Sequence, residues 1–484
     1  MAADGPKPGF LGNINQDQEV KLQKLWSVLL KAADLPSGDE SPRGCAEEPA
    51  SPSQPQRRHS LLSRTQSNVS EMTTASVAKS PHQQKLIAQL KQIGIGAQDT
   101  RTIQKALSAI SPPELRTGVM NLLKHDHPDA MLLRFLRARK WDVSKAFAMM
   151  MEAIVWRVKE MHVDDDVMAK GELHALQQER NSANVGEQKA GKDFLAQMRM
   201  GKAYVHGTDK LGRPIVVIKV RLHKPGAQSE ETLERYIVHV IESVRLTLSP
   251  PVETAAVVFD MTGFGLSNME YPPVKFILKC FEANYPESLG VLLIHNAPWV
   301  FSGIWRIIRG WMDPDIAAKV NFTNSTDDLA KFISRDQLVE ELGGSEKWEY
   351  EYMEPQENEN HKMEDTTTRD ALTRERQQIG EEFLAATSEW IQAANAKDKA
   401  KIQTAESQRA YLAERLRVNH WKLDPYTRAR LCLDRMRVIQ EGGKIDFYPK
   451  NEEIMEIMPH ETTKASEVEY LEAVNGNAAQ TAVA

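Results

Sequence analysis

Buried strands and amphipathic helices alternate along the middle of this 484-residue chain, and this alternation constrains its fold more than any other feature. Short apolar runs bounded by turn residues predict strands at 204–206, 214–220, 255–259 and 291–294. Apolar residues at helical spacing predict helices at 232–248 and 269–283. A strand, a crossover helix and a parallel strand repeat in this order. We therefore predict a mainly parallel α/β sheet flanked by helices, with ligands near the carboxyl ends of its strands.

Length, charge and cysteine content limit the class of protein. A chain of 484 residues exceeds one ordinary core, so at least two structural units are expected. The net charge of -6 argues against a general nucleic-acid binder. Cys45, Cys280 and Cys432 are too far apart for a metal or redox motif, which suggests a reducing compartment. Neither a signal peptide nor a run of ~20 apolar residues is found, so we expect a soluble, cytoplasmic protein.

Composition changes several times outside the α/β segment. Residues 1–33 include an amphipathic helix from residue 16, with Asn15 as its N-cap. Residues 34–80 are rich in Ser, Pro and charge and predict a disordered linker. Within it, Ser60 and Ser67 follow basic residues, which suits either kinase sites or plain solvated linker.

The region after residue 345 is charged and poor in apolar residues. We divide 346–484 into an acidic linker and a helical C-terminal extension, with long helices at 370–392 and 399–440. Sparse apolar anchors would dock these helices on the body of the protein or on a partner. The anchors are Phe383, Leu384, Trp390, Tyr411, Leu412, Leu416 and Trp421.

The helix predicted at 301–312 is unusually apolar. One broad face carries Phe301, Ile304, Trp305, Ile308, Trp311 and Met312. Arg306 and Arg309 mark a narrow polar stripe. Both a buried core helix and a helix at a membrane interface fit this pattern.

No catalytic constellation is found in the sequence. The segment 186–192 has the spacing of a phosphate loop, but no apolar strand precedes it and Asp193 stands where Ser or Thr is needed. Nucleophile-elbow, zinc-protease and dinucleotide motifs are absent. His295 has no nucleophile at a motif spacing, so we interpret it as structural. We therefore expect no enzymatic activity, no metal site and no cofactor.

Four separated motifs carry a resemblance to a known family. They are LLRFLRARKWDVSKA, HGTDKLGRPIVV, VVFDMTGFG and the segment 283–321. In order and spacing they resemble the CRAL-TRIO lipid-binding family, and within it the phosphatidylinositol transfer proteins of the Sec-fourteen type, in a fungal branch. The resemblance covers 81–344. It implies a helical N-terminal lobe at 81–170 and an α/β lobe at 171–345 that encloses a lipid cavity, with 301–312 as a gate helix.

The resemblance also implies roles for single residues. Arg139, Lys140, Glu287 and Lys319 match the positions that bind the inositol phosphate headgroup. Arg139 and Lys140 belong to a basic cluster with Arg134 and Arg137, which suits either an anion site or a solvated helix face. Ile316 replaces a threonine that is frequent in the family.

A second ligand is implied by two further positions. Ala255 and Val257 stand where members that carry phosphatidylcholine have hydroxyl groups. Neither side chain can hydrogen-bond a choline phosphate. We therefore expect the second ligand to be less polar, such as a sterol or another apolar lipid.

The expected function is to bind phosphatidylinositol in a closed hydrophobic cavity and exchange it between membranes. At ~0.8 kcal/mol per buried CH₂, two acyl chains account for more than ~10 kcal/mol, so a carrier must enclose them. Contact with endomembranes would be peripheral and transient. The alternative is a lipid-sensing regulator of a lipid kinase or trafficking factor, with a protein partner on the C-terminal helices. A hydrolase or a nucleotide-dependent transferase ranks third.

Overall fold

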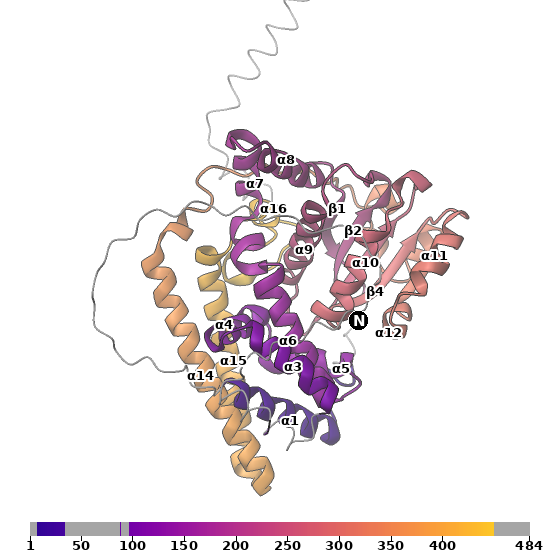
Figure 1. The fold of residues 1–484 in the computed structure, drawn as a ribbon. Helices are drawn as coiled ribbons and strands as arrows, with labels where there is room; N and C mark the ends of the chain where they lie inside the picture. Colours follow the sequence, from indigo (N-terminus) through magenta and orange to yellow (C-terminus); the bar gives the residue numbers. More distant parts are fainter. Residues whose placement is uncertain (1–6, 34–87, 89–95, 450–484) are drawn as a thin grey trace, which may run out of the picture.

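The computed structural model describes residues 7–33, 88 and 96–449. A helical lobe and an α/β lobe lie side by side, and a long C-terminal helical hairpin packs along the helical lobe (Figure 1). The predicted linker at 34–80, with Ser60 and Ser67, lies outside the described residues.

A five-stranded sheet forms the centre of the α/β lobe. Its strands follow the order β1-β2-β3-β4-β5, with β1 antiparallel to β2 and the other pairs parallel. The strands are β1 Ala203–Thr208, β2 Pro214–Lys219, β3 Ala255–Asp260, β4 Leu289–His295 and β5 Val320–Thr323. The mainly parallel α/β sheet predicted from the sequence is therefore confirmed. The sequence pattern missed β5, because four residues with two polar side chains give no apolar run.

The crossover helices all cover one face of the sheet. They are α9 (Glu230–Leu246), α10 (Tyr271–Lys279) with a π-helical turn at Cys280–Asn284, and α11 (Phe301–Arg309). Strands in sequential order, joined by crossovers of one hand, place every crossover helix on the same side. The helices predicted to flank the sheet are therefore present, and the three long crossover helices all lie on one of its faces.

The opposite face is covered by short elements. Its apolar residues pack against α13 (Thr326–Leu329), the turns at Arg335–Gln337 and Glu340–Leu342, and the rings of Trp348 and Tyr350. Tyr350 stacks on Tyr204 of β1, with ring centroids 5.7 Å apart. The start of the segment predicted as an acidic linker therefore belongs to the sheet's own packing.

The helical lobe has one core to which both the N-terminal and the C-terminal helices of the described residues contribute. Trp26 of α1 is buried there, and its indole N–H donates to Asp129 at 2.7 Å. Arg409 of α15 donates to the same carboxylate, and its guanidinium lies 4.3 Å from the ring centroid of Trp390 in α14. The lobe contains α1 (Gln16–Ala33), α3 (Ala97–Ala109), α4 (Pro112–Leu123), α5 (Pro128–Ala138), α6 (Val143–Val155), α14 (Thr366–Ala396) and α15 (Lys399–Thr427).

Two predictions for the C-terminal extension are wrong. We predicted one helix over 399–440, but α15 ends at Thr427, two residues after Pro425, and α16 (Cys432–Arg435) is separate. Arg428 and Arg430 both bond to Asp424 and Asp434, and this charge cluster holds the chain where it leaves the helix. Tyr411, expected as an anchor, is 60% exposed.

The segment between the lobes is also helical. Helices α7 (Ala169–Asn181) and α8 (Val185–Arg199) precede β1, and α8 packs on α9. Asn184 caps α8 by accepting from the N–H groups of Gly186 and Glu187. The segment 186–192 is therefore part of a helix rather than a phosphate loop.

Candidate functional site

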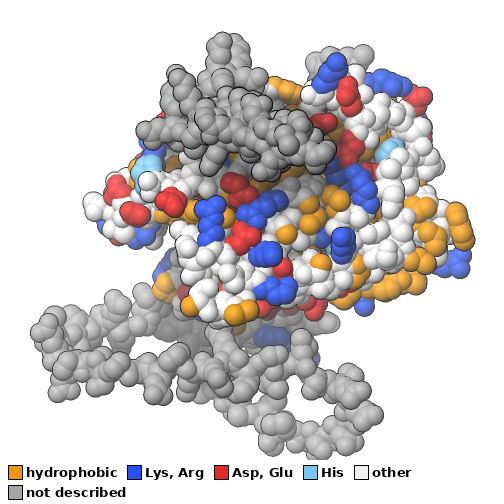
Figure 2. All heavy atoms as spheres, turned by 90° about the horizontal axis from the view of Figure 1, so that it is seen from above, with side chains coloured by type: hydrophobic (Ala, Val, Ile, Leu, Met, Phe, Trp, Pro, Cys, Tyr) orange, Lys and Arg blue, Asp and Glu red, His pale blue; other side chains and the backbone are white. Residues whose placement is uncertain are grey.

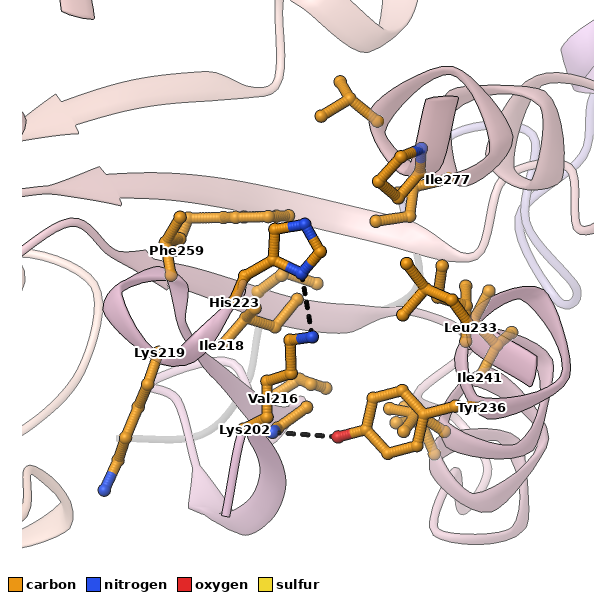
Figure 3. Close-up of a pocket in the computed structure, with 18 of the residues that line it drawn as sticks. Lys202, Val216, Ile218, Lys219, His223, Leu233, Tyr236, Ile241, Phe259 and Ile277 are labelled. Carbon is orange, nitrogen blue, oxygen red and sulfur yellow. Dashed lines mark hydrogen bonds between the residues drawn. The ribbon is translucent and has the colours of Figure 1, made fainter. Parts of the chain in front are cut away.

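A large apolar hollow lies between the sheet and the crossover helices. It measures about 1230 Å³, including space open to solvent. Val216 and Ile218 of β2 line one wall with Ala255, Val257 and Phe259 of β3. The facing wall comes from α9 and from α10, and Figure 3 shows Leu233, Ile241 and Ile277 directed across the space toward the strands.

Alternation along the strands selects the residues that line the hollow. Successive side chains of a strand point to opposite faces, so Ala255 and Val257 face the hollow while Ala256 and Val258 face the packed side. The apolar face of α9 also lines the hollow. It carries Leu233, Tyr236, Ile237, Val240, Ile241 and Val244, with Leu248 just beyond. The two residues assigned to a second ligand therefore lie in the wall of the hollow.

A smaller polar pocket lies at one end of the hollow. It measures about 620 Å³, including open space, and Arg139, Glu287 and Lys319 all line it. Lys319 Nζ donates to Glu287 Oε2 at 3.3 Å. Glu287 has φ 55°, so the turn before β4 directs it here from a strained backbone. Three of the four residues assigned to the headgroup are thus brought together.

The fourth residue does not join them. Lys140 is exposed and does not line the pocket, although it follows Arg139 directly. Arg134 and Arg137 are paired with carboxylates: Arg134 with Asp126 at 2.9 Å, and Arg137 with Glu253 at 2.8 Å. Of the basic cluster, only Arg139 is therefore placed to meet a ligand in this pocket.

Sequence reasoning missed several groups at the polar pocket. Glu282, Asp313 and Asp315 add carboxylates to its lining, and Ile316 contributes the apolar side chain noted above. Asp313 also starts α12 (Pro314–Ala317) by accepting from the N–H of Asp315. Lys319 lies two residues beyond this helix. Acceptors and cations in one pocket suit a ligand that carries both hydroxyl groups and phosphate.

The two spaces adjoin at Phe281, which lines both of them. The polar pocket lies at the amino end of the parallel strands, beside Glu287 and Leu289 before and at the start of β4. We predicted a ligand at the carboxyl ends, so the pocket lies at the opposite edge. Its residues come from the segments before β4 and β5, from the end of α5 and from the π-helical turn after α10.

Helix α11 lies outside the lining of the hollow. Phe301, Ile304 and Ile308 are buried in the core beneath the sheet, but none of the six residues assigned to the gate lines the hollow. Helix α11 ends at Arg309, so Trp311 and Met312 follow it. Trp305 contacts Phe322 of β5 edge-on, with ring centroids 5.2 Å apart.

Other candidate groups have structural partners. His295 is the last residue of β4, and its Nδ1 is 3.1 Å from the hydroxyl of Thr323. Burial lowers the pKa of His295 and raises the pKa of Cys280 to about 12. Within the described ranges, no group of three His, Cys, Asp or Glu side chains is arranged to hold a metal ion. Over the same ranges, no helix has the length and apolarity needed to cross a membrane.

An apolar hollow that ends at a pocket of cations and carboxylates is the arrangement of a lipid-binding protein. The chain matches the CRAL/TRIO domain over residues 198–344 and the CRAL/TRIO N-terminal domain over residues 100–152. It is 35% identical to a CRAL-TRIO domain-containing protein of Schizosaccharomyces pombe, over 94% of this chain and 98% of the relative. The chain belongs to the CRAL-TRIO family, as the sequence motifs indicated.

Two further similarities were found. "Phosphatidylinositol transfer protein CSR1" of Eremothecium gossypii is 41% identical, over 65% of this chain and 69% of that protein. A solved structure, "Crystal structure of Sfh5", aligns over 55% of this chain and 88% of that chain, with a TM-score of 0.35 and 14% identity.

Proposed function

We propose that this protein binds phosphatidylinositol and exchanges it between membranes without covalent chemistry. The observation that carries the proposal is the meeting of Arg139, Glu287 and Lys319 in one polar pocket that adjoins the apolar hollow at Phe281. The inositol phosphate would occupy the pocket, and the acyl chains would pass Phe281 into the hollow. The printed name of the Eremothecium relative supports this choice of lipid.

Each side chain in the pocket has a definite role in this proposal. Arg139 and Lys319 provide charge-assisted donors for the phosphate, and Arg can offer two parallel N–H groups. Glu287 holds Lys319 in place, at 3.3 Å, and would accept from ring hydroxyls of the lipid. Ile316 offers no hydroxyl, so the phosphate depends more heavily on the two cations.

Transfer of labelled phosphatidylinositol between vesicles tests the proposal. Replacing Arg139 and Lys319 together by Ala should lower transfer at least tenfold, because each charged hydrogen bond contributes about 1.5–3 kcal/mol. Lys140→Ala is the matched control, since it removes a neighbouring cation that lies outside the pocket. Its transfer rate should stay within twofold of wild type. Normal transfer by the double variant, or no lipid bound to the purified protein, would refute the proposal.

Helix α11 and its flanks offer a surface for membrane contact. Trp299 is 88% exposed, and Ile307, Trp311 and Phe322 are also exposed. Figure 2 shows hydrophobic side chains gathered at the end of the molecule where α11 lies, with Lys or Arg beside them. Apolar rings next to cations suit the interface of an anionic bilayer. We propose that α11 is the gate and that it opens when this surface meets a membrane.

The exposed position of Ile307 gives a cleaner test of the gate than the half-buried Trp305. Ile307→Glu places a charge in solvent, so folding should be unaffected, while vesicle association and transfer should fall at least fivefold. Ser302→Glu adds the same charge at another exposed position of α11 and serves as the control. Equal vesicle association of the two variants would contradict the membrane role of this surface.

A regulatory role is the alternative function, and one surface of α15 favours it. Tyr411, Arg415 and Val418 lie on the same side of the helix, and Tyr411 and Val418 are exposed. Removing the hairpin would expose the core of the helical lobe, so truncation is a poor test. Tyr411→Ala with Val418→Ser changes only the surface. Intact transfer in vitro with loss of function in cells would favour a regulator, and full function in cells would favour the carrier.

We also propose that the second ligand is less polar than phosphatidylcholine. Ala255 and Val257 line the hollow and bring no hydroxyl group to it. A zwitterionic headgroup would lose its hydration there without compensating hydrogen bonds.

A further inference from the structure

A buried lysine borders the hollow at its other end. Lys202, just before β1, is 6% exposed, and its Nζ donates to Gln197 Oε1 at 2.7 Å and to His223 Nδ1 at 2.9 Å. Figure 3 shows its side chain beneath His223, between the strand residues and those of α9. An ammonium group carries three N–H donors. The hydrogen bonds of the described residues use two of them, which leaves one for a ligand.

The hydrogen bonds fix the state of the neighbouring histidine. Because an ammonium group can only donate, Nδ1 of His223 must accept, and the ring proton lies on Nε2. Nε2 then donates to Glu270 Oε2 at 2.9 Å. Burial and the charge of Lys202 both lower the pKa of His223, so the ring is neutral near pH 7. The neutral imidazole of His223 therefore lies between the ammonium group of Lys202 and the carboxylate of Glu270.

Lys202 differs from the other cations that line the hollow. Lys219 is paired with Glu341 at 2.6 Å, and Arg245 with Glu242 at 3.4 Å. In the part of the chain that the structure describes, no carboxylate oxygen lies within 4.0 Å of Lys202 Nζ. Burial lowers the pKa of Lys202 to about 8, although the charge of Glu270 opposes this shift. The lysine remains largely charged at neutral pH and lacks a direct counter-ion.

The hollow thus has two different polar ends. The N–H of Lys219 donates to the carbonyl of Lys202, which places Lys202 at the carboxyl end of β2, where Lys219 pairs with Asp260. The polar pocket lies at the amino end, where Ala255 pairs with Leu289. Strand β3 runs between these ends, about 17 Å at ~3.3 Å per residue.

We propose that the hollow also binds a lipid that ends in a carboxylate, a long-chain fatty acid, with its acid group on Lys202 Nζ and its chain directed toward Phe281. The proposal rests on the proposed function, because the same hollow would hold the acyl chains of phosphatidylinositol. A carboxylate would supply the missing counter-charge, and a charge-assisted hydrogen bond is about twice as strong as a neutral one. Aliphatic walls accommodate the chain, and one available N–H suits a small headgroup. The two lipids would enter in opposite orientations and exclude each other.

Binding of oleate and oleyl alcohol to the delipidated full-length protein tests this inference. The two probes have the same chain and differ in the charge of the headgroup. Oleate should bind at least tenfold more tightly, and Lys202→Met should remove this preference while leaving oleyl alcohol unaffected. Lys219→Met is the matched control, since Lys219 lines the same hollow but is already paired. Its preference for oleate should stay within twofold of wild type.

Displacement of phosphatidylinositol and thermal unfolding make the outcome definite. Oleate should displace pyrene-labelled phosphatidylinositol from loaded wild-type protein. Lys202→Met should unfold at the same temperature as wild type or higher, because it removes a buried unpaired charge; if it fails to fold, Lys202→Gln replaces it. Equal binding of oleate and oleyl alcohol, an unchanged preference in the Lys202 variant, or tighter binding of a sterol that ignores Lys202 would overturn the inference. Oleate binding without any phosphatidylinositol transfer would refute the proposed function and leave this inference standing.

Discussion

The two faces of the sheet use alternate residues of the same strands, yet one is packed solid and the other leaves a hollow. Val217, Val258 and Leu293 meet Leu338, Ile333 and the rings of Trp348 and Tyr350. One residue along, Ala255 and Val257 face α9 and α10 across a hollow of about 1230 Å³ that includes space open to solvent. Protein interiors are normally close-packed, so an apolar hollow on one side of a well-packed sheet suits a ligand.

Two buried charges close to α9 differ in the same way. Glu172 of α7 is bonded to His239 of α9 and also accepts from the hydroxyl of Tyr352 at 2.9 Å, from the N–H of Cys432 at 3.0 Å, and from Arg435. Lys202, which lines the hollow, lacks a direct ion pair among the described residues. Other residues of the protein therefore satisfy the charge of Glu172, whereas the charge of Lys202 has no carboxylate partner among the described residues.

The largest effect is expected from truncation on the packed face. Leu338→Ala should lower the free energy of unfolding by about 2–5 kcal/mol, because Leu338 is 1% exposed and its removal leaves a cavity. Ile241→Ala on the hollow side should lower it by only about 1 kcal/mol, since its side chain already borders empty space. Urea denaturation of both variants measures the difference. Equal losses would mean that the hollow is filled by packing in solution.

Lowering the pH should have an intermediate effect on the free energy of unfolding. Burial alone would raise the pKa of Glu172, but the charge of Arg435 and the bonds from His239 and Cys432 lower it to about 2. A carboxyl group with a lowered pKa stabilises the folded state above its unfolded value of 4.5 and loses that contribution as the pH falls toward 2. We expect a loss of up to about 3 kcal/mol over this window.

Glu172→Gln provides the control for the acid experiment. The variant should be less stable at pH 7, because Arg435 loses its partner in the interior. Its stability should also change less between pH 4.5 and 2 than that of the wild type. Identical pH dependence of unfolding in the two proteins would show that Glu172 does not keep the lowered pKa.

Phe substitutions at two adjacent positions of β3 should change the stability least and should distinguish the two faces of the sheet most clearly. Val258→Phe should cost about 1–3 kcal/mol, because it overpacks the filled side. Val257→Phe, one position away, should change the free energy of unfolding by less than about 0.5 kcal/mol, since its ring enters empty space. The same ring should reduce the lipid that co-purifies, measured by mass spectrometry. Normal lipid loading of Val257→Phe would place the ligand elsewhere.

The sequence by itself determined the local elements and the family. Four of the five strands, helix α9 and helix α1 follow from apolar periodicity, because the spacing of apolar residues is a local property. The resemblance to the family singled out Ala255 and Val257, and both line the hollow. The helix at 232–248 was predicted from its apolar spacing, since a helix that buries one stripe shows it in its sequence.

Only the tertiary structure decided which of these elements meet. Arg139 and Lys140 are neighbours in sequence, but α5 ends at Ala138 and the turn that follows sends Arg139 to the pocket and Lys140 to solvent. Both ends of the described chain join one core through Asp129, a contact between positions more than 100 residues apart. Lys202 gives no signal in the sequence, because a lysine becomes unusual only when folding buries it without a carboxylate. Such neighbours depend on long-range packing, which no local pattern contains.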